Sequence, residues 1–203
     1  MSKRVIVIAS GETERRSLPH LVAHLRAEDI YVVEVRRPDG NKALNVEMAE
    51  KLVKAAWYAP TDSLTPDKFV ILVDTDAKDP DQVLRPFREQ LPGRLGARIK
   101  ATVQFAYAQR HLEAWYFADF DNLRKCLGGR DLGSVDASQP DKIQDPKRHL
   151  KNLLEDRAYT AVVSEQIASK LKAEAIADRS ASFRRFLEAV RNGSVGTGVS
   201  GTA

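Results

Sequence analysis

The sequence predicts an α/β fold with a mostly parallel sheet, helices on both faces of the sheet, and a helical C-terminal part. Four short apolar runs occur before residue 109, and helical spacing of apolar residues follows each of them. No strand pattern occurs after Gly133. Strands that alternate with helices form parallel sheets, because a parallel pair needs a long crossover connection that is usually helical.

The predicted strands cover residues 5–9, 30–35, 69–73 and 101–108. The first is a continuous apolar run that ends at Ser10-Gly11, and the third ends at Asp74-Thr75-Asp76. Continuous apolar runs are typical of strands buried on both faces. Ligands bind beyond the carboxyl ends of such strands, so the acidic residues there are candidates for a functional site.

The spacing of apolar residues predicts helices over 18–25, 46–57, 80–91, 111–127, 146–157, 160–177 and 181–191. Pro80 suits the first turn of its helix, and Gly128-Gly129 closes the fourth helix. We therefore expect a Rossmann-like α/β domain at 1–133 and a helical C-terminal extension at 134–191. Residues 192–203 are rich in Gly, Ser and Thr, which predicts a disordered tail.

The charge distribution permits a polyanionic partner. Residues 142–191 carry eleven Lys and Arg against seven Asp and Glu, whereas residues 1–141 carry equal numbers. A basic excess of this kind is compatible with nucleic acid, although solvated helix faces have the same pattern. The candidates for phosphate or partner contact are Lys147, Arg148, Lys151, Arg184 and Arg185.

The single cysteine, Cys126, excludes an intramolecular disulfide and a cysteine-based zinc cage. A reducing, cytoplasmic compartment is therefore expected. No apolar run approaches the roughly 18 residues that a membrane helix needs, so we expect no membrane partner. The apolar stretch near the N-terminus is too short for a signal peptide and is interpreted as a strand.

Asp74 and Asp76 are the strongest candidates for a metal site. Residues two apart in a strand leave the same face, and two carboxylates held close together repel unless a proton or cation lies between them. Hard cations such as Mg²⁺ bind oxygen ligands, commonly one or two carboxylates. The alternative is a solvated turn at the end of the strand that caps the next helix.

The segment Ser10-Gly11-Glu12-Thr13-Glu14 follows the first strand. Glu14 is a candidate ligand for a metal or substrate, and Glu12 is a weaker one. The helix macrodipole alone also favours acidic residues in a first turn. One glycine does not make a phosphate-binding loop.

The segment His111-Leu112-Glu113-Ala114-Trp115 opens the helix after the fourth strand. Glu113 is positioned to reach the same edge of the sheet, and His111 is a candidate base or phosphate contact. Trp115 is expected in the core, as are most tryptophans on apolar helix faces.

Taken together, the motifs resemble a known family. A small α/β chain with a Thr-Glu after the first strand and an Asp-x-Asp after a later strand looks like the TOPRIM fold of topoisomerases, primases and OLD-type nucleases. The set resembles more closely the family of unknown function numbered 4276, which consists of small TOPRIM-like bacterial proteins, many encoded beside ATPases in anti-phage systems. The motifs that carry this resemblance are Gly11-Glu-Thr-Glu14, Asp74-Thr-Asp76, His111-Leu-Glu-Ala-Trp115, Asp145-Pro-Lys147 and Ser182-Phe-Arg184.

The resemblance implies metal-dependent phosphodiester chemistry, with Mg²⁺ or Mn²⁺ held by Asp74 and Asp76. Glu14 then completes the cluster as a metal ligand or as a general acid or base, and Glu113 and His111 are further catalytic candidates. The implied protein is a nuclease-like effector of a bacterial defence system, regulated by a separate ATPase. Its implied substrate is DNA or RNA, including tRNA.

The sequence departs from the family pattern at Ser10. The family has Glu-Gly at the end of the first strand, where this chain has Ser10-Gly11. Serine cannot act as a carboxylate base, so either Glu12, Glu14 or Glu113 takes over or the protein is a weakened or inactive relative.

Two alternatives stay open at this point. One is a non-catalytic TOPRIM-like protein that docks on an ATPase or a nucleic acid. The other is a hydrolase of small phosphoesters. A haloacid-dehalogenase phosphatase is disfavoured, because its nucleophile belongs on the first strand and the Asp-x-Asp pair follows the third.

Overall fold

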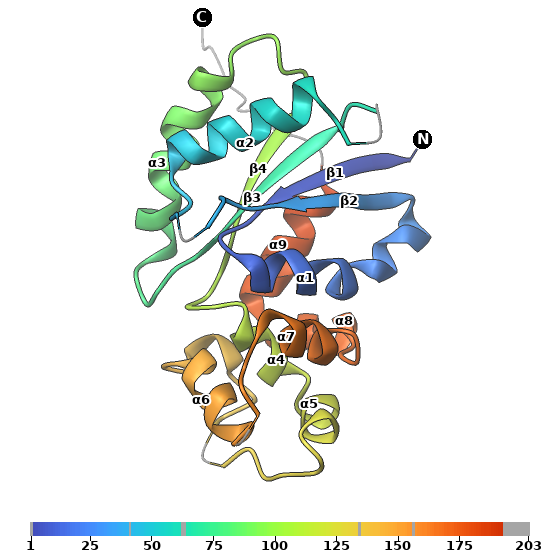
Figure 1. Ribbon diagram of the computed structural model, residues 1–203, viewed down its shortest axis with the longest axis vertical. Helices are drawn as coiled ribbons and strands as arrows, with labels where there is room; N and C mark the ends of the chain where they lie inside the picture. The colour runs from blue at the N-terminus through green and yellow to red at the C-terminus, as the bar shows by residue number, and fades with distance from the viewer. Residues whose placement is uncertain (1, 41, 62–63, 134, 156, 193–203) are drawn as a thin grey trace, which may run out of the picture.

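The computed structural model describes residues 2–40, 42–61, 64–133, 135–155 and 157–192 (Figure 1). Four strands form one parallel sheet in the order β2-β1-β3-β4. Their bounds are β1 (Lys3–Ile8), β2 (Ile30–Arg36), β3 (Lys68–Asp74) and β4 (Thr102–Ala108). The predicted parallel α/β sheet is confirmed, and β1 lies beside β3, which is the order that the TOPRIM resemblance implies. The predicted tail lies outside the described residues except for Asn192.

Helices cover both faces of the sheet, as predicted. One face packs on α2 (Val46–Tyr58) and α3 (Pro80–Leu95), and the other packs on α1 (Glu12–Leu21) and α9 (Ala181–Arg191). Successive side chains of β1 point to opposite faces of the sheet, as expected for a strand. Ile6 and Ile8 enter the core under α2 and α3, whereas Val5 and Val7 enter the core under α1 and α9.

The remaining helices form the helical C-terminal part and its connection to β4. They are α4 (Glu113–Ala118), α5 (Phe120–Cys126), α6 (Pro146–Leu153), α7 (Ala161–Ala168) and α8 (Ala173–Arg179), with the short 3₁₀ turn η2 (Pro140–Lys142). Another 3₁₀ turn, η1 (Ala23–Glu28), lies between α1 and β2. One continuous apolar core runs from the sheet face under α1 and α9 into these helices. The boundary expected between 133 and 134 stays a prediction.

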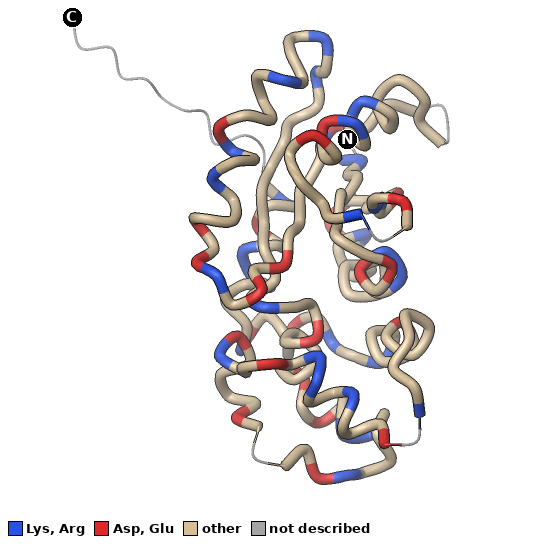
Figure 2. The backbone as a smooth tube through the Cα atoms, turned by 60° about the vertical axis from the view of Figure 1, so that its left-hand side comes forward, with Lys and Arg blue, Asp and Glu red and all other residues tan. Residues whose placement is uncertain are grey.

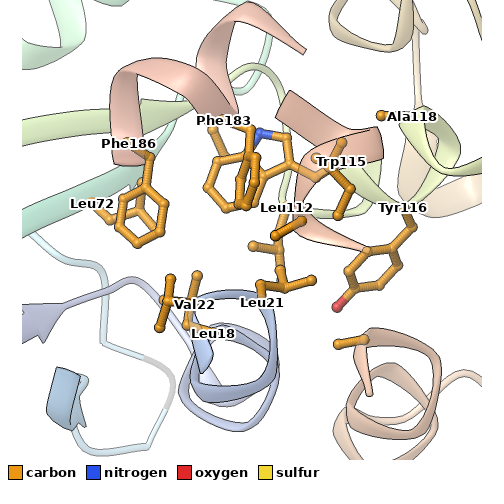
Figure 3. Packing of buried hydrophobic residues seen from close by; sticks show 14 of the residues in the cluster. Leu18, Leu21, Val22, Leu72, Leu112, Trp115, Tyr116, Ala118, Phe183 and Phe186 are labelled. Atoms are coloured by element: carbon orange, nitrogen blue, oxygen red, sulfur yellow. The ribbon is translucent and has the colours of Figure 1, made fainter. Parts of the chain in front are cut away.

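Trp115 occupies the centre of this shared core, as expected. Its ring lies 4.9 Å from the ring of Phe183 and 5.4 Å from that of Phe186, between ring centroids. The indole N–H donates to Ser182 Oγ at 2.8 Å, so the buried polar atom is satisfied. In Figure 3, Trp115 faces the two phenylalanines of α9, while Tyr116 points away from them.

Three of the predicted helices differ in the structure. The helix predicted over 18–25 covers the end of α1 and the start of η1, with a turn at Val22 between them. The other two are broken, the one over 111–127 at Asp119 and the one over 160–177 at 169–172. The two breaks meet, because Asp119 Oδ2 accepts from the backbone N–H of Lys172 at 2.7 Å and from Asn122 Nδ2 at 2.9 Å. A buried carboxylate that binds a free backbone N–H stabilises both breaks at once.

The last described helix, α9, is hydrogen-bonded to the amino end of the sheet. The buried Lys68 ammonium donates to the carbonyls of Ala189 at 3.0 Å and Val190 at 2.9 Å. Burial lowers the pKa of Lys68 to about 8. A cation at a helix C-terminus satisfies the carbonyls that the helix leaves unpaired. In the described parts of the chain, no helix is both long and apolar enough to cross a membrane.

Candidate functional site

The carboxyl ends of β3 and β4 are joined by a set of backbone bonds. The N–H of Thr75 donates to Ala108 O at 3.2 Å, and the N–H of Asp76 donates to Arg110 O at 3.2 Å. The N–H of Arg110 in turn donates to Thr75 Oγ1 at 2.7 Å. Three non-glycine residues here have left-handed backbones, with φ of 48° at Asp76, 69° at Ala77 and 64° at Arg110. Such strained conformations concentrate at functional sites.

Glu14 and Asp74 form a carboxyl pair at this edge of the sheet. Glu14 lies in α1 with 6% of its surface exposed, and Asp74 is the half-buried last residue of β3. Removal from water raises the pKa of both groups, and for Asp74 the negative charge of Glu14 raises it further. Both groups therefore hold a proton more tightly than exposed carboxyl groups do.

Glu113 and Lys147 complete the surroundings of the pair. The negative charge of Glu113 contributes to the raised pKa of both carboxyl groups, whereas the positive charge of Lys147 opposes it. Glu113 opens α4 and is 2% exposed. Lys147 lies in the first turn of α6, which begins at the Asp145 cap. The structure thus brings together Glu14, Asp74, Glu113 and Lys147 from four helices and strands.

Asp76 and His111 form a second pair on the rim. His111 Nε2 lies 3.0 Å from Asp76 Oδ1, and the Asp76 side chain is 68% exposed. The predicted common face of Asp74 and Asp76 is not found, because β3 ends at Asp74 and the backbone turns at Asp76. The charge of Asp76 still contributes to the raised pKa of Asp74, so the two pairs are neighbours.

Glu12 is engaged elsewhere. Its carboxylate accepts from Arg15 at 2.6 and 2.7 Å, from Arg16 at 2.9 Å and from Arg37 at 2.8 Å. The bond from Arg15, with help from Arg37 and Arg16, lowers its pKa to about 2. Of the three glutamates considered as replacements for a carboxylate at Ser10, only Glu14 and Glu113 lie beside Asp74.

The predicted basic residues fall into two groups. Lys147, Arg148 and Lys151 lie on α6, and Arg184 and Arg185 lie on α9. The guanidinium of Arg185 donates to Tyr107 Oη at 2.7 Å, and that of Arg184 donates to the carbonyls of Ala177 and Asp178. The α6 group lies closer to the carboxyl pair, because Lys147 belongs to it. Figure 2 shows that basic and acidic residues are mixed throughout the helical part.

Sequence reasoning missed the hydroxyl groups behind Glu113. Tyr159 Oη lies 2.8 Å from Glu113 Oε1 and 3.0 Å from Ser164 Oγ. Ser164 is also bonded to Tyr116 at 2.6 Å and to Ser17 at 3.0 Å. These partners are far apart in the sequence and share no motif, so no sequence signal connects them to Glu113.

The donor chemistry of the carboxyl pair fits a hard divalent cation. Among the described residues, no three His, Cys, Asp or Glu side chains are arranged as a complete set of metal ligands. Mg²⁺ commonly binds through one or two carboxylates and takes its other ligands from water and phosphate. Glu14 and Asp74 match that smaller requirement, since both are oxygen donors and the neighbouring negative charge of Glu113 favours a cation there.

Comparisons with known proteins were made for the sequence and for the fold. The family model described as "Domain of unknown function (DUF4276)" matches residues 10–191. No curated protein matches the sequence. Among solved structures, the chain is similar to the C-terminal region of the OLD protein of Xanthomonas campestris pv. campestris. The identity is 18%, the match covers 93% of this chain and 94% of that chain, and the TM-score is 0.46.

Proposed function

The chain belongs to the family described as domain of unknown function DUF4276, and from that premise we propose that it is a divalent-metal-dependent enzyme that cleaves phosphodiester bonds in nucleic acid. The observation that carries the proposal is that Glu14 and Asp74 lie together beside Glu113 and Lys147 at the carboxyl edge of the sheet. In this proposal the pair shares one proton in the absence of metal. The predicted family resemblance is confirmed, while the ATPase partner, the cytoplasmic location and the role in bacterial defence stay predictions.

In this proposal Glu14 and Asp74 hold Mg²⁺ or Mn²⁺ once their shared proton has left. A bound ion of this kind stabilises charge on a phosphate and helps to generate the attacking group. Lys147 offsets the negative charge of the pair and binds a phosphate oxygen of the substrate. Glu113 accepts and returns a proton at its carboxylate. His111, which is paired with Asp76, acts as a base or phosphate contact on the exposed side of the site.

Nucleic acid is proposed as the substrate rather than a small phosphoester because basic residues continue along α6 beyond the carboxyl pair. Arg148 and Lys151 are exposed on the same helix as Lys147. A polyanion that lies along α6 would contact these side chains in turn, whereas a small phosphoester would reach only Lys147.

Calorimetric titration with Mn²⁺ tests the metal site. If the ion displaces the proton that Glu14 and Asp74 share, binding should release about one proton per ion, which is measured by repeating the titration in buffers of different ionisation enthalpy. Glu14→Gln and Asp74→Asn should weaken binding at least tenfold. Glu12→Gln is the matched control, since Glu12 lies two residues away in α1 and is paired with arginines.

Cleavage assays with labelled single- and double-stranded DNA and RNA then test the reaction. We expect Mn²⁺-dependent products from the wild-type protein and from Glu12→Gln, and none from Asp74→Asn. Metal binding without cleavage of any of these substrates would contradict the nuclease proposal while leaving the metal site in place.

A second candidate function is a non-catalytic protein that docks on an ATPase or nucleic acid. It is favoured by the incomplete set of metal ligands among the described residues. Equal and negligible Mn²⁺ binding in wild type and Asp74→Asn would make this candidate the better one.

A further inference from the structure

The carboxylate of Glu113 is held from the helical part of the molecule. Glu113 is buried at the start of α4, and its Oε1 accepts from Tyr159 Oη at 2.8 Å. Tyr159 belongs to the connection between α6 and α7 rather than to the sheet. Burial, and next the negative charge of Glu113, raise the pKa of Tyr159, so its hydroxyl keeps the hydrogen that it donates.

The Tyr159 hydroxyl also donates to Ser164, which lies behind it. Ser164 is fully buried and lies within bonding distance of three hydroxyls, those of Tyr159 at 3.0 Å, Tyr116 at 2.6 Å and Ser17 at 3.0 Å. A hydroxyl has one hydrogen and two acceptor positions. The single hydrogen of Tyr159 is therefore shared between Ser164 Oγ and Glu113 Oε1.

Glu113 Oε1 is the nearer of the two acceptors, at 2.8 Å against 3.0 Å for Ser164 Oγ. Ser164 is bonded in turn to Tyr116 and Ser17, so the hydroxyls behind Tyr159 keep its side chain in place. Chains of this kind strengthen their members by mutual polarisation.

We propose that Tyr159 is a positioning residue that holds Glu113 beside the Glu14–Asp74 pair. The inference rests on the proposed function and deepens it, since it assigns a residue of the helical part to the reaction site. Tyr159 itself touches neither metal nor substrate.

The contact is tested by a double-mutant cycle in chemical denaturation. Tyr159→Phe removes only the hydroxyl, and Glu113→Leu removes the carboxylate at similar volume. We expect the free energies of unfolding of the two single variants not to add in the double variant, as for other residues in contact. Simple additivity would overturn the inference, whether or not the protein cleaves nucleic acid.

The role is tested by the kinetics of nucleic-acid cleavage. Tyr159→Phe should lower kcat about tenfold or more, because general acid–base groups contribute at least that much, with KM and the Mn²⁺ dissociation constant unchanged. Tyr159→Phe should have no further effect on kcat in the Glu113→Leu background. Tyr107→Phe is the control, because it removes a hydrogen-bonded hydroxyl from β4 that has no contact with Glu113.

The outcomes separate the two proposals. A wild-type protein without turnover contradicts the proposed function and with it the kinetic role of Tyr159, while the denaturation cycle still decides whether Tyr159 holds Glu113. An active wild type with an equally active Tyr159→Phe variant leaves the proposed function intact and overturns the inference. An equal loss of kcat in Tyr107→Phe also overturns it, since the effect would then be general.

Discussion

Gly11 lies directly against the carboxylate of Glu14. A Cβ atom added at Gly11 would stand 3.0 Å from Glu14 Oε2, which is closer than a normal carbon–oxygen contact. The backbone of Gly11 is extended, with φ of −151°, so any residue could adopt it. Glycine is needed at this position for its small size and not for its conformation.

Gly11→Ala should therefore displace the Glu14 carboxylate from Asp74. We expect Mn²⁺ affinity to fall about tenfold, equivalent to roughly 1.4 kcal/mol, with little change in stability. Calorimetric titration measures the affinity. Gly93→Ala in α3 is the control, because nothing lies within 4 Å of its Cβ position, and helix propensity predicts a stabilisation of about 0.5–1 kcal/mol.

The raised pKa values of Glu14 and Asp74 predict a specific dependence of stability on pH. The folded protein holds protons on these groups more tightly than the unfolded chain does. Their contribution is therefore largest below the ordinary pKa values of 4.5 and 3.8 and is lost as pH rises toward the raised folded values. Mn²⁺ should restore stability at neutral pH by replacing the proton.

Asp74→Asn measures this contribution. The variant should have the higher free energy of unfolding at pH 8 without metal, and the difference from wild type should shrink toward pH 4. Denaturant titrations at several pH values give the comparison. A difference that is constant with pH would show that the carboxyl pair does not bind its proton more tightly in the folded protein.

Lys68 should be important for stability although it lies at the opposite end of β3 from the site. Lys68→Ala removes the buried side chain and leaves the α9 carbonyls without their donor, so we expect a loss of about 2–4 kcal/mol. Lys68→Met retains the packing and should lose less. Lys51→Ala, on the exposed side of α2, should change stability by less than about 0.5 kcal/mol.

Lys147→Ala should reduce the dependence of nucleic-acid binding on salt. If Lys147 contacts one phosphate, the slope of log affinity against log salt concentration should fall by about one. Fluorescence anisotropy at several salt concentrations measures this slope for DNA and RNA oligonucleotides. Arg184→Ala should change it less, because Arg184 already donates to carbonyls of α8. A larger change in the slope for Arg184→Ala than for Lys147→Ala would place the nucleic acid along α9.

The fold could be predicted because its main signals are local. Apolar runs and helical spacing identified each strand and most helices, and the β1–β3 neighbourhood followed from the family resemblance. The helix breaks at Asp119 and Lys172 could not be predicted, because they depend on one hydrogen bond between residues 53 positions apart. Apolar spacing continues through both breaks and contains no information on that bond.

The same distinction applies to the site. Acidic residues at strand ends are visible in a sequence, and the structure brings Glu14, Asp74 and Glu113 together. The prediction that Asp74 and Asp76 share a face extended the alternation of side chains along a strand to Asp76. That alternation holds only within a strand, and β3 ends at Asp74, two residues before Asp76. Tyr159 lies 46 residues from Glu113 in a segment without a motif, so only the fold reveals their contact.

The position of α9 has a consequence for biosynthesis. This helix covers a face of the sheet whose four strands are complete by residue 108, yet it spans Ala181–Arg191. A ribosome adds about 5–20 residues per second, so that apolar face stays uncovered for several seconds after the last strand has been made. Because α1 is made early and contacts the β2 side of this face, the part left uncovered is the one that α9 contacts, on β3 and β4. During that interval Val70 and Leu72 of β3 would be available to chaperones that bind apolar strands.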